Sequence, residues 1–186
     1  PDLPPKEAKS VHKPVREGKC ASCHDPHGSQ FAPALTKAPA ALCASCHKPL
    51  ADRIAGAKYK HRPIEKGGCG TCHEAHGAAN ATLLKKDQPA LCVGCHKTDG
   101  AIFAKKHMGY PVASSRCTSC HDPHAASKLA LLSDNVHAPV AKKACAQCHE
   151  SPSSQKPFAT KSSGAALCRM CHADRINKML EKNRLH

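Results

Sequence analysis

The sequence predicts a mostly irregular coil with short α-helices and little or no β-sheet. Three observations lead to this fold class. The 186 residues include three Phe, two Tyr and no Trp, so the large side chains of an ordinary apolar core are nearly absent. Pro and Gly, at 15 and 11 residues, interrupt most segments. No stretch of useful length alternates apolar and polar residues as a strand would.

Short helices are expected where good helix formers replace Pro and Gly. One is predicted over Pro89–Lys97, with similar helices at the other Leu-Cys sequences. The best helix candidate runs from Ala165 to about Lys182, because this segment is rich in Ala, Leu, Met, Arg and Lys.

All 14 cysteines lie in C-x-x-C-H motifs, which occur seven times. This motif is the attachment signature of c-type haem: two thiols add to the vinyl groups, and the adjacent His reaches the iron. The predicted attachment residues are Cys20, Cys23, Cys43, Cys46, Cys69, Cys72, Cys92, Cys95, Cys117, Cys120, Cys145, Cys148, Cys168 and Cys171. The predicted proximal iron ligands are His24, His47, His73, His96, His121, His149 and His172. The sequence therefore predicts seven covalently bound haems, with the coil wrapped around the haem chain.

Other uses of cysteine explain the pattern less well. A disulfide scaffold does not require a histidine after every second cysteine. Zinc sites need four ligands each and no fixed trailing histidine. A thioredoxin-type redox motif would be expected once.

The composition fits a thin polypeptide around porphyrins, which would supply the missing apolar volume. Without haem the chain is expected to be unfolded, as small metal domains are without metal. The formal net charge is +14, and two propionates on each of seven haems would cancel it. Nucleic-acid binding is not expected, because no aromatic stacking platform accompanies the basic residues.

The motifs form a repeat of long period. His12, His61 and His137 are each followed by x-Pro, and each lies eight positions before a first-motif cysteine; His107 starts a looser copy. We therefore predict a single heptahaem domain, 1–186, made of repeats: two-haem units at 10–58 and 59–106, a one-haem half unit at 107–136, and a final two-haem unit at 137–186.

Eight histidines remain as candidates for the second axial position. Two histidines three residues apart lie side by side on a turn, so the second His of C-H-x-x-H should serve another haem. An upstream His has enough chain to fold over the haem of its own motif. The predicted pairs are His12 with the Cys20 haem, His27 with Cys43, His61 with Cys69, His76 with Cys92, His107 with Cys117, His137 with Cys145, and His124 with Cys168. His186 is left over, and Met108, Met170 and Met179 are competing ligands.

The sequences His-x-Pro, C-x-x-C-H-[DE]-x-H-G and Leu-C-x-x-C-H, repeated in pairs, resemble the doubled-motif multihaem c cytochromes. The resemblance covers nearly the whole chain from His12 to His172. It departs from the pattern at the half unit and after Cys148, where the second His is missing. The resemblance implies an electron carrier of the periplasm, a haem chain of an outer-membrane conduit, or a polymerising extracellular cytochrome.

The predicted function is electron transfer through closely spaced bis-histidine haems, without catalysis, because saturated irons have no open site. The alternative is a multihaem reductase, for example of nitrite or hydroxylamine, with one open haem. Expected partners are other redox proteins or cytochromes, or copies of the chain itself in a filament. A carrier and a filament subunit both remain open, and His186 could cross to a neighbouring subunit.

The expected location is extracytoplasmic, periplasmic or extracellular, because haem is attached covalently outside the cytoplasm. The chain starts at Pro1 without Met, so we expect a mature chain from which an export signal was removed. No run of 18 apolar residues occurs, so no transmembrane segment is expected.

Overall fold

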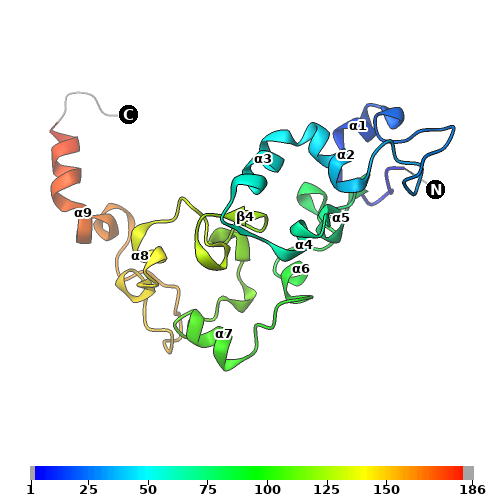
Figure 1. Ribbon diagram of the computed structural model, residues 1–186. Coiled ribbons are helices and arrows are strands. Elements are labelled where there is room, and N and C mark those ends of the chain that lie inside the picture. Colours follow the sequence, from blue (N-terminus) through cyan, green and yellow to red (C-terminus); the bar gives the residue numbers. More distant parts are fainter. Residues whose placement is uncertain (1–2, 182–186) are drawn as a thin grey trace. The chain divides into compact units, whose positions relative to one another are not determined.

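A computed structural model describes residues 3–181 of the chain. The described residues, whose helices and strands are labelled in Figure 1 where there is room, divide into two compact units. The first unit contains the chain up to His96 together with Ser114–Val136. The second contains Lys97–Ala113 and the described residues from His137 onward. Each unit is considered by itself.

The first unit consists of short elements joined by loops. Its β-strands are β1 (Ser10–Val11), β2 (Tyr59–Lys60), β3 (Gly77–Ala78) and β4 (Ala125–Ala126). Its α-helices are α1 (Lys13–Arg16), α2 (Pro39–Cys46), α3 (Lys48–Gly56), α4 (Arg62–Glu65), α5 (Cys69–Cys72) and α6 (Ala90–Val93). Its 3-10 helices are η1 (Cys20–Ser22), η2 (Ala81–Leu83), η4 (Cys117–Ser119) and η5 (Leu129–Leu131).

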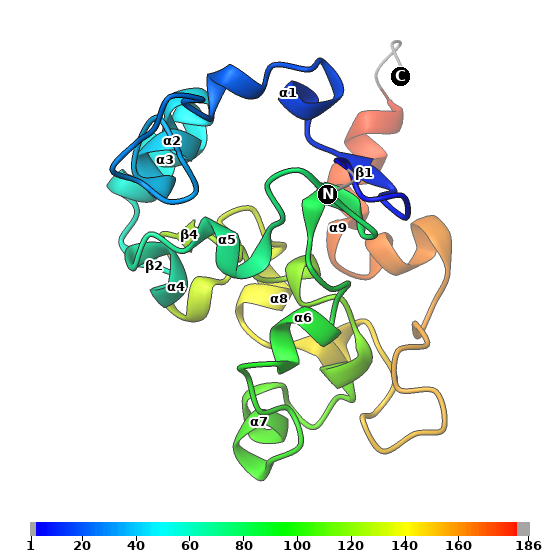
Figure 2. The ribbon, with the colours of Figure 1, turned by 90° about the vertical axis from the view of Figure 1, so that its right-hand side faces the viewer.

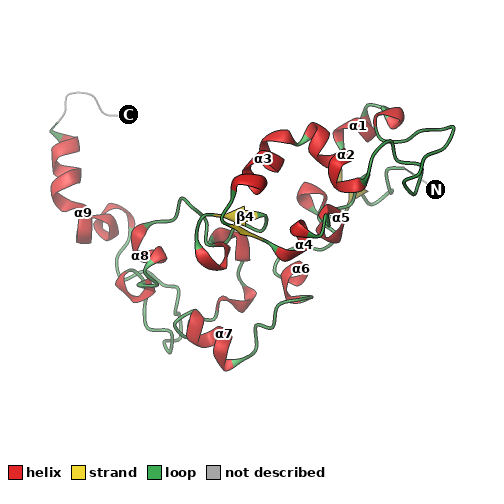
Figure 3. Ribbon diagram, in the orientation of Figure 1, coloured by secondary structure: helices red, strands yellow, loops and turns green. Residues whose placement is uncertain are grey.

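The second unit contains α7 (Ala101–Lys106), α8 (Ala138–Ala141), η6 (Cys145–Gln147) and α9 (Gly164–Leu180), and η3 (Val112–Ser114) spans the boundary. Loops connect these mostly short helices and very short strands, as Figure 3 shows. The predicted fold class is therefore confirmed. The predicted helix from Ala165 is present as α9, whereas the helix predicted over Pro89–Lys97 is only the four residues of α6.

The His-x-Pro sequences fix the start of three helices. In α1, α4 and α8 the Pro stands in the first turn, where its missing N–H and fixed φ are no disadvantage. His12, His61 and His137 are the N-cap residues, with extended backbone. Each upstream histidine is therefore held at a helix start and lies outside the helix.

Two short antiparallel pairs connect distant parts of the sequence. β1 pairs with β3, so that Ser10 faces Ala78 and Val11 faces Gly77. β2 pairs with β4 in the same way, with Tyr59 opposite Ala126 and Lys60 opposite Ala125. In both cases residues just before an upstream histidine pair with residues just after a C-H-x-x-H sequence. Helices α2 and α3, which follow each other in sequence, lie against each other (Figure 2).

The polypeptide has almost no core of its own. Among the described residues, only Ala78, Tyr110, Ala125 and Ala126 are buried apolar side chains. The chain exposes 13701 Å² of surface. A compact monomer of 19.7 kDa would expose about 8,600 Å² by the usual scaling of area with mass. The excess is surface that a large apolar group can cover. No described helix combines the length and the apolar character needed to cross a membrane.

Candidate functional site

The first motif of each repeat forms one tight helical turn. The histidine N–H donates to the carbonyl of the first cysteine, at 3.0 Å for His24, 3.1 Å for His73 and 3.0 Å for both His121 and His149. This turn brings both thiols and the imidazole to neighbouring positions on one short segment. The five residues of the motif therefore supply two attachment points and one iron ligand.

The imidazoles of these first-motif histidines are oriented by backbone carbonyls. Each Nδ1 lies within hydrogen-bond distance of the carbonyl nine residues later in the chain. The pairs are His24 with Pro33 at 3.1 Å, His73 with Thr82 at 2.9 Å, His121 with Ala130 at 2.9 Å and His149 with Phe158 at 3.0 Å. A carbonyl only accepts, so each Nδ1 carries the proton and Nε2 keeps a lone pair for a metal.

The second motif of each full repeat starts in an α-helix that begins before its first cysteine. Cys43 and Cys46 are in α2, Cys92 is in α6, and Cys168 and Cys171 are in α9. The N–H of His47 donates to the carbonyl of Cys43 at 2.9 Å, and that of His96 to the carbonyl of Cys92 at 3.0 Å. The leucine before each of these motifs thus continues a helix, which explains why this motif has its own sequence signature.

Histidine rings that are distant in sequence face each other in pairs. Their ring centroids are 5.9–6.2 Å apart, and the five pairs are His12 with His47, His24 with His76, His61 with His96, His73 with His124, and His137 with His172. The interplanar angles are 10–20° in the first four pairs and 38° in the last.

This separation fits an iron between the rings. Two imidazoles on opposite sides of one metal place their ring centres about 6 Å apart, given metal–nitrogen bonds of about 2.0 Å and about 1 Å more to each ring centre. Every pair contains one histidine of a C-x-x-C-H motif, which holds the haem to be ligated. The residues present therefore fit haem groups with two axial histidines.

The pairs follow two rules that differ from the predicted assignment. An upstream histidine pairs with the second motif of its own repeat: His12 lies at His47 and not at His24, and likewise for His61 and His137. The reason is the N-cap position, which places the upstream histidine at a helix start a few residues before the first motif. The predicted pairing of His12, His61 and His137 with the Cys20, Cys69 and Cys145 haems is therefore wrong.

The second His of C-H-x-x-H does face the histidine of a different motif, as the turn argument predicts, but in the opposite direction along the chain. His76 pairs with His24, and His124 pairs with His73, each one repeat back along the chain. The predictions of His76 for the Cys92 haem and of His124 for the Cys168 haem are therefore wrong. The strand pairs explain this, because β3 and β4 follow His76 and His124 and anchor them to the preceding repeat.

The other three of the eight candidate histidines are His27, His107 and His186. His27 has no ring pair among residues 3–181; it lies 3.6 Å from Asp25 and is 95% exposed. His107 contacts Phe103 through its ring and the Phe103 carbonyl through Nδ1, at 2.9 Å. Its assignment to the Cys117 haem joins residues of the two units and stays a prediction. His186 lies outside the described residues. The three methionines are exposed.

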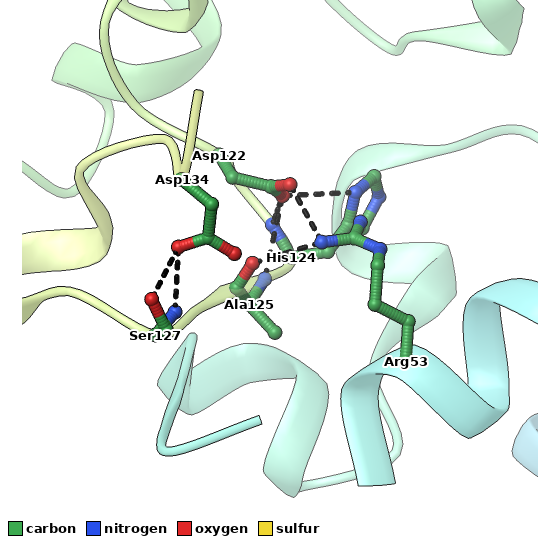
Figure 4. Close-up of polar contacts among 6 residues, drawn as sticks. All are labelled: Arg53, Asp122, His124, Ala125, Ser127 and Asp134. Atoms are coloured by element: carbon green, nitrogen blue, oxygen red, sulfur yellow. Dashed lines mark hydrogen bonds and ion pairs between the residues drawn. The ribbon is translucent and has the colours of Figure 1, made fainter. Parts of the chain in front are cut away.

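A charged cluster holds the segment that carries His124 (Figure 4). Arg53 of α3 donates from Nη1 to Asp122 Oδ2 at 2.7 Å and to the Ala125 carbonyl at 2.9 Å. The N–H of His124 donates to Asp122 Oδ1 at 2.9 Å. Burial alone would raise the pKa of Asp122, but these hydrogen bonds outweigh it and lower that pKa. Burial lowers the pKa of His124, which favours the neutral imidazole that a metal needs.

Thiols of successive motifs lie close together. Burial, followed by a hydrogen bond to Cys117, raises the pKa of Cys92 to about 11. Burial and a hydrogen bond to Cys69 likewise raise the pKa of Cys43. In both cases the second motif of one repeat adjoins the first motif of the next, so the haems attached there would be neighbours.

Some functional residues were not singled out from the sequence. Arg53 was missed because it acts 69 residues away from Asp122. Tyr110 was also missed; its hydroxyl donates to the Glu150 carbonyl at 2.7 Å, and its ring meets that of His149 edge-on at 6.5 Å. The acidic residue in C-H-[DE]-x-H was the available signal for Asp122.

Comparison with protein families shows which family this sequence matches. The model of the doubled CXXCH motif matches residues 12–52, 61–101, 110–136 and 137–177. These four matches follow the repeats described above, including the short third one. Comparison with curated proteins found no match. The matched residues make up most of the chain, which therefore belongs to the doubled CXXCH motif family and is a multihaem c-type cytochrome of electron transfer.

Proposed function

We propose that this chain conducts electrons through seven c-type haems, each with two axial histidines, outside the cytoplasm. The observation that carries the proposal is the set of histidine rings paired at 5.9–6.2 Å, each pair containing one motif histidine. Haem iron supplies reversible one-electron chemistry, at a lower potential with two histidines than with methionine and histidine. The protein's part is to hold the rings and to occupy both axial positions.

The arrangement also supports continuous transfer. A single C-H-x-x-H segment carries two histidines that belong to different pairs: His73 pairs with His124, and His76 pairs with His24. Two haems ligated from one such segment must be close to each other. Electron tunnelling falls off exponentially with edge-to-edge distance, so this spacing favours fast transfer along the row. Both an extracytoplasmic carrier and a filament subunit would use this property, and c-type haem attachment outside the cytoplasm supports the location.

The alternative is a multihaem reductase with one open haem. It has one observation in its favour: the ring of His149 contacts Tyr110 and Phe158, and no histidine pairs with it among the described residues. An open position at this haem would admit a small substrate.

Spectroscopy of the purified holoprotein tests the proposal. We expect seven haems per chain by mass, and magnetic circular dichroism and EPR dominated by low-spin, bis-histidine iron. The reduced protein should not turn over nitrite or hydroxylamine. Several high-spin haems per chain, or rapid nitrite turnover, would contradict electron conduction as the main role and support the reductase.

A further inference from the structure

The chain has three Phe and two Tyr, and one residue of each type lies against a single motif histidine, His149. The Tyr110 ring lies 6.5 Å from the His149 ring at an interplanar angle of 66°, and the Phe158 ring lies 6.1 Å from it at 88°. Tyr110 and Phe158 also contact each other, with ring centroids 5.8 Å apart. All three residues belong to the second unit. The motif histidines that have histidine rings as neighbours are His24, His47, His73, His96 and His172.

Phe158 stands at a position that smaller residues occupy in the other repeats. Its carbonyl lies 3.0 Å from Nδ1 of His149, nine residues before it in the chain. The residues whose carbonyls do the same for the other first-motif histidines are Pro33, Thr82 and Ala130. The backbone bond is therefore common to four first motifs, whereas an aromatic ring at this position is specific to the final repeat.

Tyr110 is held beside His149 by its hydroxyl group. The hydroxyl donates to the carbonyl of Glu150 at 2.7 Å, and Glu150 directly follows His149 in the chain. The Tyr110 residue is only 5% exposed, which makes it the one large side chain among the buried apolar residues of the described chain. The tyrosine ring and the motif that carries His149 are therefore fastened together.

The residue before Tyr110 packs closely against the same motif. Pro152 stands three residues after His149, where the other first motifs have the second His of C-H-x-x-H. A Cβ on Gly109 would lie 3.6 Å from the Cβ of Pro152, and Gly109 has a φ of +76°, which glycine adopts at little cost. The final repeat thus uses the position of the missing histidine to hold the segment that carries Tyr110.

A nearby cation does not distinguish this motif from the others. Lys161, twelve residues after His149, donates from its backbone N–H to the carbonyl of the second motif cysteine at 2.9 Å. Lys85 stands at the same position after His73 and makes the same backbone bond at 2.9 Å. A lysine here is common to two repeats, so the aromatic rings are what sets the surroundings of His149 apart.

Enclosure by apolar rings favours the reduced state of a haem. The porphyrin contributes two negative charges, so a ferric core with two neutral histidines has one net positive charge, and reduction by one electron removes it. Surroundings that exclude water disfavour a charged group. Burial and solvent exposure are accordingly among the factors that set haem potentials. Rings packed against the His149 imidazole should therefore raise the potential of the haem that it ligates.

We propose that Tyr110 and Phe158 raise the reduction potential of the haem held by the His149 motif, as positioning residues that act through the His149 imidazole. An electron that reaches the second unit then resides on this haem in preference to the haem of the His172 motif. The two thiols of the His172 motif are exposed, whereas those of the His149 motif are half-buried. This inference rests on the proposed conduction through haems and assigns the place where electrons collect in this unit.

Potentiometric titration of the holoprotein, followed by NMR of the haem methyl groups, gives the potential of each haem. In Tyr110→Ala and in Phe158→Ala, we expect the haem of the His149 motif, about one haem in seven, to shift to a lower potential without a change of spin state. Tyr110→Phe keeps the ring and loses only the hydroxyl bond, so it should keep the wild-type potential. Thr82→Ala is the matched control, because Thr82 has the position of Phe158 relative to His73, and it should leave every potential unchanged. Phe158 is 45% exposed, so Phe158→Ala should fold even where Tyr110→Ala does not.

Three results would overturn the inference. One is an unchanged potential in Phe158→Ala or in a folded Tyr110→Ala. Another is a Tyr110→Phe variant that shifts as far as Tyr110→Ala, since the hydroxyl bond and not the ring would then set the potential. The third is a wild type in which the haem of the His172 motif is reduced before that of the His149 motif. All three leave electron conduction intact, whereas a chain without haem at these motifs, by mass, would contradict the proposed function itself.

Discussion

At the scale of single residues, the protein controls its candidate iron ligands through the nitrogen that does not bind iron. Four first-motif histidines have Nδ1 bonded to a carbonyl nine residues later. The upstream His12 uses the Ala75 carbonyl in the same way, at 2.9 Å. Such bonds fix the tautomer and the ring plane and make Nε2 a better ligand. Backbone carbonyls outside the motif thus orient these histidines for iron binding.

Substitution of one distal histidine should show directly which haem it ligates. In His76→Ala, the Cys20 haem should lose its second ligand and become high-spin, because His76 faces His24 at 6.0 Å. The Cys92 haem, whose motif histidine faces His61 at 5.9 Å, should stay low-spin. A crystal or electron-microscopy structure of the carbon monoxide adduct would show which iron binds the gas. Carbon monoxide on the Cys92 haem would refute the pairing described above.

At the scale of elements, very short pieces are held together by contacts between repeats. The strands β1 to β4 have two residues each, far below the length of a strand that is stable alone. The Arg53 side chain ties α3 to the segment that carries β4 through Asp122 and Ala125. The segments that carry His76 and His124 are therefore positioned by a neighbouring repeat, so loss of one of these contacts should affect a ligand in another repeat.

Removal of the Arg53 tie should destabilise the protein measurably. Arg53→Ala deletes two hydrogen bonds and leaves Asp122 partly buried without its cation, so we expect a loss of about 1 kcal/mol, reduced from the value of a buried pair by solvent screening. Lys48→Ala is the control, because the Lys48–Asp52 pair is exposed on one helix and should cost less than about 0.5 kcal/mol. Guanidinium denaturation followed by the Soret band gives both values. Equal losses in the two variants would show that Arg53 does not have this role.

The close approach at β3 offers a second test. A Cβ on Gly77 would lie 3.1 Å from Ala8 Cβ and 3.2 Å from Pro4 Cβ, so Gly77→Ala should loosen the β1–β3 pair and cost about 1 kcal/mol. Gly56→Ala should be neutral or slightly stabilising, because nothing lies within 4 Å of its Cβ and Ala favours the helix. Hydrogen exchange of the His12 amide should accelerate in Gly77→Ala alone. An unchanged exchange rate would mean that the strand pair tolerates the methyl group.

At the scale of the whole molecule, covalent haem must replace the missing core. Only four apolar side chains are buried among residues 3–181, which cannot offset the entropy of ordering a chain of this length. The basic charge of +14 is also unbalanced until propionates are present. Folding and haem attachment should therefore be one event.

The chain without haem is accordingly expected to be unfolded. Produced in a cell without haem attachment, it should give the far-UV circular dichroism of a coil and unprotected amide exchange, whereas the holoprotein should be protected. Cooperative thermal unfolding of the haem-free chain would show that the polypeptide has a core that its side chains do not reveal.

The sequence by itself determined the haem motifs, the repeats and the sparse secondary structure. These features are local: C-x-x-C-H closes within one turn, and His-x-Pro sets a helix start at the same residue in every repeat. It also predicted correctly that neighbouring histidines of one C-H-x-x-H sequence belong to different pairs. The sequence did not show which upstream or distal histidine pairs with which motif histidine. Pairing His76 with His24, and His12 with His47, depends on strand pairing between residues 10–11 and 77–78. The length of chain between motifs allows a histidine to pair with a motif before it or after it. Only backbone hydrogen bonds formed between repeats select one of the two.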